Sequence, residues 1–421
     1  MNITNLLTIL VFFNYYNPLS VSLTLIVNVF FFIGLSIINA KEGLRRVRLN
    51  QTVLIISFVL CLWALLLMIT NWNFNVYVFG KYFRTLISSI LLMMVISLLK
   101  PNASQLIKAL SFIFLLHVVF VFLQVLFPQL DVPMAQIFGF NRKTEIISSM
   151  SIRKLGLSSS YDTAALISIA SMIFFFLRYL IRPKIIFILL SLLSLASTVR
   201  ISRTGMVIGV LIFGIFAIYF IRKFKGRKRI ALMSLFGVGM LLAVYLMLPI
   251  IAASTVSLLL ESQSDGMVVS NDDYSTGSTL SLLNSLYDAM QISWQGFVFG
   301  LGIDPNNLVG RHTDIGYIKI VYHVGLIGSI LLFYLHFYFY RASVKVKRIY
   351  HKDLSLVLLS NFVVLYMVLL GIMNVKSLEI YSRGAYELLL ISFLILVGPV
   401  SKETSTELLK FKPQRFSSKW E

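Results

Sequence analysis

Charged residues are scarce in this 421-residue chain: Asp, Glu, Lys and Arg make up 13% of it, against about 25% in soluble globular domains. Hydrophobic residues make up 58% instead, and they gather in apolar runs close to bilayer length. This composition excludes a soluble enzyme, a coiled coil, a disordered chain and a disulfide scaffold. The sequence therefore predicts a polytopic membrane protein, with residues 1–421 forming one integral membrane domain.

Cysteine and the familiar motifs of soluble catalysis are also scarce or missing. The single cysteine, Cys61, lies within an apolar run, so it forms no internal disulfide, and a thiol in hydrocarbon stays protonated and inert. The sequence has no P-loop, GxSxG, HExxH or CxxC motif, which argues against a nucleotide-driven pump and a zinc protease. Because residues 1–16 lack a basic region and a small-residue cleavage site, no cleavable signal peptide is expected.

Apolar runs predict an all-α fold, a transmembrane helical bundle of about twelve spans. The first run is short and leads into Asn17-Pro18, so a partial or interfacial span is an alternative for it. The seventh is also short, but basic residues bracket it as anchors. The predicted spans are residues 5–16, 19–39, 52–70, 82–99, 106–128, 163–181, 185–199, 205–221, 230–252, 315–340, 355–374 and 384–400.

Basic residues indicate the orientation of these spans. Counted on alternate sides of the bundle, 25 of the 37 Lys and Arg residues fall on one side, together with only 5 of the 17 Asp and Glu residues. Because positively charged loops stay in the cytoplasm, both termini and the basic tail 401–421 are predicted to be cytoplasmic. The net charge of +20 therefore reflects topology, and the expected partners include membrane lipids but no nucleic acid.

Two connections on the predicted outer side are long, residues 128–162 and 253–314. Connections of this length are usually functional or disordered, whereas the cytoplasmic ones are too short to hold a soluble nucleotide-binding domain. In the second connection, residues 254–261 and 279–293 have the apolar spacing of short helices that lie on the membrane surface. We therefore expect any chemistry at the outer face.

Arginines at the outer face form the first two candidate sites. Arg142 and Arg153 lie in the first long connection, where Gly156 and nearby serines would let the backbone approach a ligand. Arg200 and Arg203 lie in a tight turn between two spans, against the positive-inside bias. A guanidinium gives bidentate hydrogen bonds to phosphate, so these arginines are candidate phosphate or pyrophosphate ligands. Ordinary membrane anchors and lipid phosphates are the alternative interpretations.

Ionisable residues late in the chain form the third candidate site. Arg311, His312 and Asp314 are predicted at the membrane edge, and Lys319 and His323 inside the following span. In a helix that begins near His312, Lys319 and His323 fall on the same stripe as His312. An ionisable residue inside a span is costly unless it faces the bundle or water, and is therefore a functional candidate. The alternative is that Lys319 snorkels outward and His323 makes an interhelical hydrogen bond.

Three segments in this order, in a chain with many spans and two long outer loops, resemble the O-antigen and capsule polymerases of the Wzy type and the related O-antigen ligases. The segments are Arg153–Ala164, the turn Ser202–Gly205 and the glycine-rich Phe299–Gly328. Arg203 and Gly214 also match an Arg-x10-Gly pattern of some of these polymerases. The resemblance covers the whole chain in layout but only 46 residues in motif.

The resemblance implies a C-type glycosyltransferase in the bacterial plasma membrane, without a nucleotide sugar, metal or other cofactor. Its substrates would be glycans on undecaprenyl pyrophosphate, and a chain-length regulator is a further candidate partner. His312 or Asp314 would act as the general base; because the polar residues that surround the ligase histidine are missing here, both stay open. Arginines would stabilise the leaving pyrophosphate. These are Arg142, Arg153, Arg200 and Arg203, with Tyr161, Arg311, Lys319 and His323 in supporting places.

The leading prediction is a polymerase that joins lipid-linked repeat units into O-antigen, capsule or exopolysaccharide. A ligase of the same family, which moves finished glycan to another acceptor, is the nearest alternative. A lipid-linked oligosaccharide flippase or other permease belongs to a different class, and it would place ionisable residues in mid-span in both halves of the chain. Here these residues gather at the outer edges, and the outer loops are long, which favours an enzyme.

Overall fold

The computed structural model describes residues 2–16, 21–39, 49–71, 76–137, 154–158, 160–223, 292–305, 315–375 and 384–398, with the single positions 234 and 237. Over these residues the chain is all-helical, without a strand, which confirms the predicted class for this part of the protein. The helices are α1 (Ile3–Tyr16), α2 (Val21–Ile38), α3 (Gln51–Thr70), α4 (Val76–Leu99), α5 (Ala103–Leu126), η2 (Pro128–Leu130), α6 (Asp131–Ile137), α8 (Tyr161–Ile181), α9 (Ile185–Val199), α10 (Arg203–Lys223), α13 (Trp294–Phe299), α14 (Gly316–Ile349), α15 (Leu354–Met373) and α16 (Ala385–Val397).

Helices occur at eleven of the twelve predicted spans, and the remaining one, 230–252, lies outside the described residues except for positions 234 and 237. Six helices are long and apolar enough to cross a membrane within the described part of the chain: α3, α4, α5, α8, α14 and α15. Five shorter apolar helices accompany them. The protein is therefore a membrane-embedded helical bundle, while the count of twelve spans stays a prediction.

Short polar side chains determine where several helices begin. At the start of α5, the Asn102 side chain accepts from the Gln105 N–H (2.8 Å), and the Gln105 side chain accepts in return from the Asn102 N–H (2.9 Å). Ser160 caps α8 by accepting from the Thr163 N–H at 3.2 Å. Such caps satisfy backbone donors that a helix end would leave unpaired. The cap at Ser160 also ends the first long connection at a defined place.

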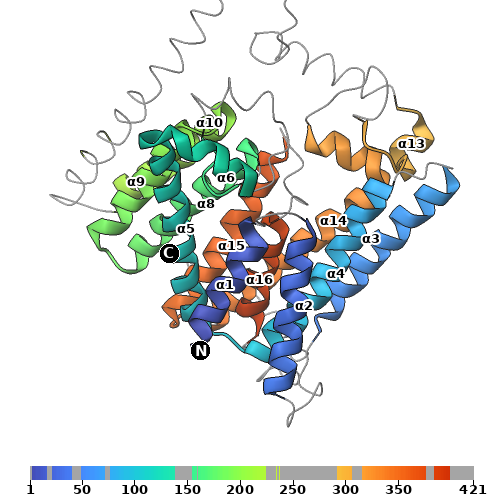
Figure 1. Cartoon of the computed structure of the whole chain (residues 1–421), viewed down its shortest axis with the longest axis horizontal. Coiled ribbons are helices and arrows are strands. Elements are labelled where there is room, and N and C mark those ends of the chain that lie inside the picture. Colours follow the sequence, from blue (N-terminus) through green and yellow to red (C-terminus); the bar gives the residue numbers. More distant parts are fainter. Residues whose placement is uncertain are drawn as a thin grey trace, which may run out of the picture.

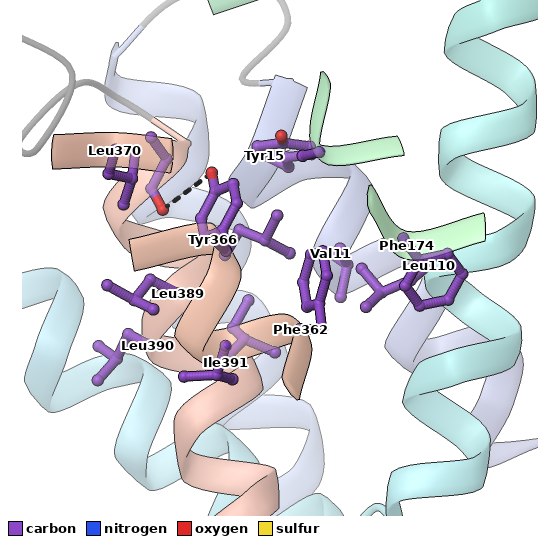
Figure 2. Packing of buried hydrophobic residues seen from close by; sticks show 14 of the residues in the cluster. Val11, Tyr15, Leu110, Phe174, Phe362, Tyr366, Leu370, Leu389, Leu390 and Ile391 are labelled. Carbon is purple, nitrogen blue, oxygen red and sulfur yellow. Dashed lines mark hydrogen bonds between the residues drawn. The ribbon is translucent and has the colours of Figure 1, made fainter. Parts of the chain in front are cut away.

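An aromatic cluster forms the core where α5, α8 and α15 meet (Figure 2). The ring centroids of Phe114 and Phe174 are 5.3 Å apart, and those of Phe174 and Phe362 are 5.5 Å apart. All three side chains are fully buried. Close packing of large, stiff rings leaves these helices little freedom to slide. The cluster therefore fixes α5 against α8, the two helices that contribute to the first candidate site.

Both long connections join the bundle at the same end. Figure 1 shows α6 and α13 at the upper end of the bundle and the N-terminus at the lower end. The first connection contains η2 and α6, and α13 lies within the second. The predicted surface helices at residues 254–261 and 279–293 lie outside the described residues, apart from 292 and 293.

Candidate functional site

The first two predicted sites are adjacent in the folded chain. The backbone N–H of Lys154, which follows Arg153 in the sequence, donates to the carbonyl of Arg200 at 2.9 Å. Arg200 ends α9, where its own N–H donates to the carbonyl of Ser197 at 3.1 Å. The backbone of Arg203 begins α10 directly after this turn. Arg142 and Arg153 themselves lie outside the described residues.

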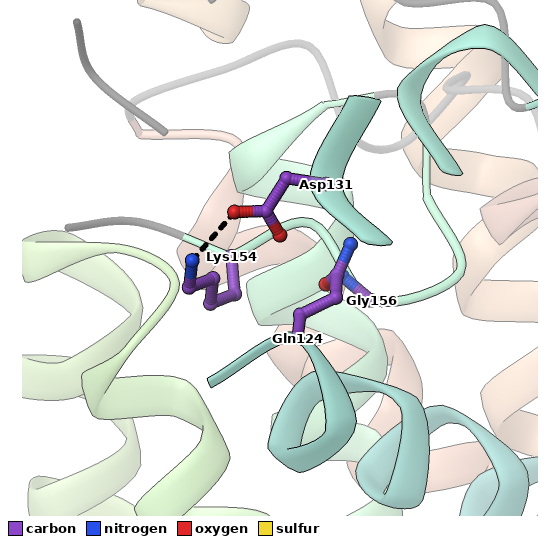
Figure 3. Close-up of polar contacts among 4 residues, drawn as sticks. All are labelled: Gln124, Asp131, Lys154 and Gly156. Atoms are coloured by element: carbon purple, nitrogen blue, oxygen red, sulfur yellow. Dashed lines mark hydrogen bonds and ion pairs between the residues drawn. The ribbon is translucent and has the colours of Figure 1, made fainter. Parts of the chain in front are cut away.

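A short buried segment, Lys154–Ser158, packs against α5 and will be called the docked loop (Figure 3). Gly156 makes this close approach possible: its φ is +58°, and a Cβ atom there would lie 2.6 Å from Cε1 of His117. The N–H of Gly156 donates to Oε1 of Gln124 at 2.7 Å. Gly156 was expected to help a ligand approach the backbone, but its N–H is already bonded, so here it serves packing on α5.

An ion pair ties the docked loop to α6. Nζ of Lys154 lies 2.5 Å from Oδ2 of Asp131, and both side chains are more than nine-tenths buried (Figure 3). Burial raises the pKa of the Asp131 carboxyl, and the neighbouring ammonium opposes this rise without cancelling it. The attraction of the Lys154 ammonium therefore does not fully offset the cost of removing the Asp131 carboxylate from water. The pair defines where the loop meets α6, while its net contribution to stability is small.

Three buried polar atoms around the docked loop have no hydrogen-bond partner within the described part of the chain. They are Nε of Arg200, Nε2 of Gln124 and Oδ1 of Asp131. A buried donor or acceptor without a partner costs about 1–3 kcal/mol, which a bound ligand or water can recover. Arg200 is the cation among the three, and it is therefore placed to donate to an oxyanion. Tyr161, the first residue of α8, lies half-buried beside the end of this loop.

The third predicted site is built around a break in α14. Gly325 has φ +67° and ψ −172°, which interrupts the helix that was predicted as one continuous span. The chain after α13 packs against this break, and the N–H groups of Leu301 and Gly302 donate to the carbonyl of Tyr322 at 2.8 and 3.1 Å. At membrane depth, carbonyls freed by a break need such donors from elsewhere in the protein. The break and the segment after α13 therefore form one unit.

Trp63 of α3 holds the same unit from another side. Its Nε1 donates to the carbonyl of Val324 at 3.0 Å and to that of Phe299 at 3.2 Å. Nδ2 of Asn71, just beyond α3, donates to the carbonyl of Leu301 at 2.9 Å. One indole thus joins the break in α14 to the end of α13, and α3 positions the third site.

Replacing Trp63 by phenylalanine is expected to destabilise the protein by about 1–3 kcal/mol, because the aromatic packing stays but two carbonyls lose their donor. Denaturant unfolding of the purified protein in detergent measures this change. Trp294→Phe is the matched control, since Trp294 is 75% exposed, and it should leave the unfolding midpoint unchanged. Equal unfolding midpoints for Trp63→Phe and the parent protein would show that these two hydrogen bonds from Trp63 do not stabilise the fold.

His323 lies fully buried in α14, one turn of helix from Lys319. Its Nε2 is 3.7 Å from Oδ2 of Asp304, and neither ring nitrogen has a hydrogen-bond partner within the described residues. The interhelical hydrogen bond considered as an alternative for His323 is therefore not formed with any residue that the structure describes. Lys81 of α4 and Lys319 interact electrostatically with the imidazole. One acidic side chain therefore lies beside this buried histidine, and two basic side chains act on it electrostatically.

Helix α14 begins at Gly316, and Ile315 before it has extended backbone angles. The helix therefore does not reach back to His312, and the predicted stripe contains only Lys319 and His323. This corrects the expected helix start near His312. The described chain resumes at Ile315, so Arg311, His312 and Asp314 lie outside the described residues.

Several residues of these sites were not singled out from the sequence. His117 and Gln124 are polar residues within an apolar span, a signal that could have marked them. Trp63, Asp131 and Asp304 carry no comparable signal, since their partners lie far away in the sequence. Among the described residues, no group of three or more His, Cys, Asp or Glu side chains could hold a metal ion.

No protein-family model matches this chain, and a search of curated proteins finds no significant match. The function must therefore be argued from the residues and their geometry.

Proposed function

We propose that this protein is a glycosyltransferase that joins undecaprenyl-pyrophosphate-linked repeat units into a polysaccharide at the outer face of the bacterial plasma membrane. The observation that carries this proposal is Arg200, whose Nε is buried and finds no hydrogen-bond partner among the described residues, in a turn bonded to the docked loop. A cation held in this way at the end of an apolar bundle suits a lipid-linked anion. The resemblance in layout and motifs to the Wzy-type polymerases supports the same reading.

In the proposed reaction, the growing glycan is transferred to a hydroxyl at the non-reducing end of a new lipid-linked repeat unit. The bond from the anomeric carbon to the pyrophosphate oxygen breaks, and a bond to the acceptor oxygen forms. The electron pair leaves with undecaprenyl pyrophosphate, and the acceptor proton passes to a base, His312 or Asp314. Arginines stabilise the charge that develops on the leaving group, which is where electrostatic catalysis has its largest effect. They are Arg142, Arg153, Arg200 and Arg203.

The third site supports the acceptor in this proposal. Gly316, the first residue of α14, follows Asp314 after one residue, and Lys319 and His323 lie on its first two turns. Since the bonds from Trp63, Leu301 and Gly302 hold this part of α14, the segment that carries the proposed base begins from a rigid support. Tyr161 and Arg311 complete the proposed supporting residues. We place both termini in the cytoplasm and count a chain-length regulator among the candidate partners.

The experiment that tests this function is the size profile of lipid-linked and surface glycan in a strain that lacks the gene. We expect single repeat units at the surface and no ladder, with the ladder restored by the wild-type gene. Long chains left on the undecaprenyl carrier would instead identify a ligase, and repeat units trapped in the cytoplasmic leaflet would identify a flippase. An unchanged ladder would reject all three functions.

A further inference from the structure

The docked loop is held entirely by groups from other elements. Its residues Lys154 to Ser158 are all buried, although the loop itself is not helical and precedes the start of α8 by only a few residues. The N–H of Lys154 is bonded to α9, that of Gly156 to Gln124 of α5, and that of Leu157 to Nδ1 of His117 at 3.3 Å. The N–H of Lys154 therefore depends on the position of α9, and those of Gly156 and Leu157 depend on the position of α5.

His117 joins this loop, through a series of polar groups, to the turn between α9 and α10 that carries Arg200, which will be called the arginine turn. Because Nδ1 accepts from Leu157, a neutral ring carries its proton on Nε2. Nε2 lies 3.1 Å from Oγ of Ser168 in α8, which also accepts from Oγ of Ser197 in α9 at 3.0 Å. The carbonyl of the same Ser197 accepts from the N–H of Arg200.

The three side chains of this hydrogen-bonded series are fully buried: His117, Ser168 and Ser197 are all 0% exposed. In such surroundings, water cannot replace a lost hydrogen bond, so each polar group depends on the next one. The arginine turn is therefore bound to the docked loop twice, directly through Lys154 and indirectly through His117. Displacing either partner would leave buried polar groups unpaired.

We propose that His117 is a positioning residue for Arg200: it holds the docked loop and the end of α9 in one arrangement, so that Nε of Arg200 points to the bound pyrophosphate. The proposal rests on the proposed role of Arg200 as a pyrophosphate ligand. His117 itself lies in the interior of α5, below the loop, and does not touch the substrate. Its two ring nitrogens bond to the loop and to Ser168 of α8, a task that an apolar side chain of the same size cannot perform.

The first part of the test measures whether His117 keeps the loop docked. Ser158, which is 2% exposed, is replaced by cysteine in a full-length protein whose own Cys61 is replaced by alanine. In nanodiscs, a membrane-impermeant maleimide should label this cysteine slowly. His117→Leu should speed labelling by about tenfold, as expected for the loss of one buried hydrogen bond. His117→Asn, which keeps an acceptor near Nδ1, should stay within about threefold of the parent. Equally slow labelling in His117→Leu overturns the proposal.

The second part measures whether the loop positions Arg200, with inorganic pyrophosphate as the probe. Its affinity for the protein in nanodiscs should fall about tenfold in His117→Leu and be largely kept in His117→Asn. In an Arg200→Ala background, His117→Leu should have no further effect, because two residues that act through one contact are not additive. If His117→Leu instead disrupted the fold in general, it would lower the affinity further in the Arg200→Ala background as well.

The outcomes separate the two proposals. Rapid labelling in His117→Leu with unchanged pyrophosphate affinity would show that the loop does not position Arg200, and would overturn the inference while leaving the proposed function in place. If the parent protein binds no pyrophosphate, the role of Arg200 fails, and the positioning role fails with it. The labelling rates still decide in that case whether His117 docks the loop.

Discussion

Replacing Arg200 by alanine is expected to abolish the polysaccharide ladder while the protein still inserts and accumulates. The side chain contributes a buried donor that has no partner of its own, so its removal breaks no hydrogen bond of Nε within the described structure. If Arg200 binds the leaving pyrophosphate, the loss of one such donor lowers the rate by about 10²–10³-fold. The measurement is the glycan ladder of a deletion strain that expresses the variant, beside the membrane level of the protein.

Arg182→Ala is the matched control for this experiment. Arg182 is exposed and lies just after α8, at the far end of that helix from the docked loop. Its replacement should leave the ladder unchanged. Arg200→Lys keeps the charge but not the planar fork, so an intermediate ladder is expected. Arg153→Ala and Arg203→Ala should also abolish polymer. Full-length polymer in Arg200→Ala, at normal protein levels, would remove the pyrophosphate assignment.

Replacing Gly325 by alanine is expected to have the largest effect on the fold. A Cβ atom at this position would lie 2.3 Å from the backbone N of Gly300, and the φ of +67° is strained for any residue with a Cβ. Backbone cannot move aside as a flexible side chain can. Strain of about 1–3 kcal/mol from a backbone conformation that is essentially confined to glycine and about 1–3 kcal/mol from overpacking act together. We expect a clear fall in the thermal midpoint and in the yield of folded protein.

Gly80→Ala is the control for this substitution. Gly80 lies in α4, and a Cβ atom added there meets nothing within 4 Å. Because glycine weakens a helix interior by about 0.5–1 kcal/mol relative to alanine, Gly80→Ala should be neutral or slightly stabilising. Gly300→Ala should resemble Gly325→Ala, since its Cβ would lie 2.5 Å from the N of Gly325. A Gly325→Ala protein as stable as the Gly80→Ala protein would show that the backbone at Gly325 is not in contact with the backbone at Gly300.

The sequence predicted the positions of the helices well, and the reason is local. In a bilayer each segment must satisfy its own backbone hydrogen bonds, so a run of apolar residues forms a helix whatever its neighbours are. The predicted spans 52–70, 185–199 and 355–374 therefore agree with α3, α9 and α15 within one residue at each end. This local rule fails at Gly325, where the apolar run is continuous but the helix is interrupted before it resumes.

The break at Gly325 depends on donors that are distant in the sequence. Trp63, Leu301 and Gly302 supply the N–H groups that donate to the freed carbonyls, and no pattern near Gly325 predicts them. In the candidate sites, too, the sequence pointed to single residues but not to their neighbours in the fold. Chemistry and charge bias singled out Arg200 and His323, but their surroundings came from residues such as His117 and Asp304 that the sequence did not connect with them.

By itself, the sequence determined the class of this protein, its apolar helices and the types of side chain available for chemistry, because hydropathy and charge act over short stretches of chain. Only the tertiary structure decided that the docked loop meets the arginine turn and that α13 meets the break in α14. Both contacts join segments far apart in the chain, and they form because buried polar groups must find partners wherever the folded bundle offers them.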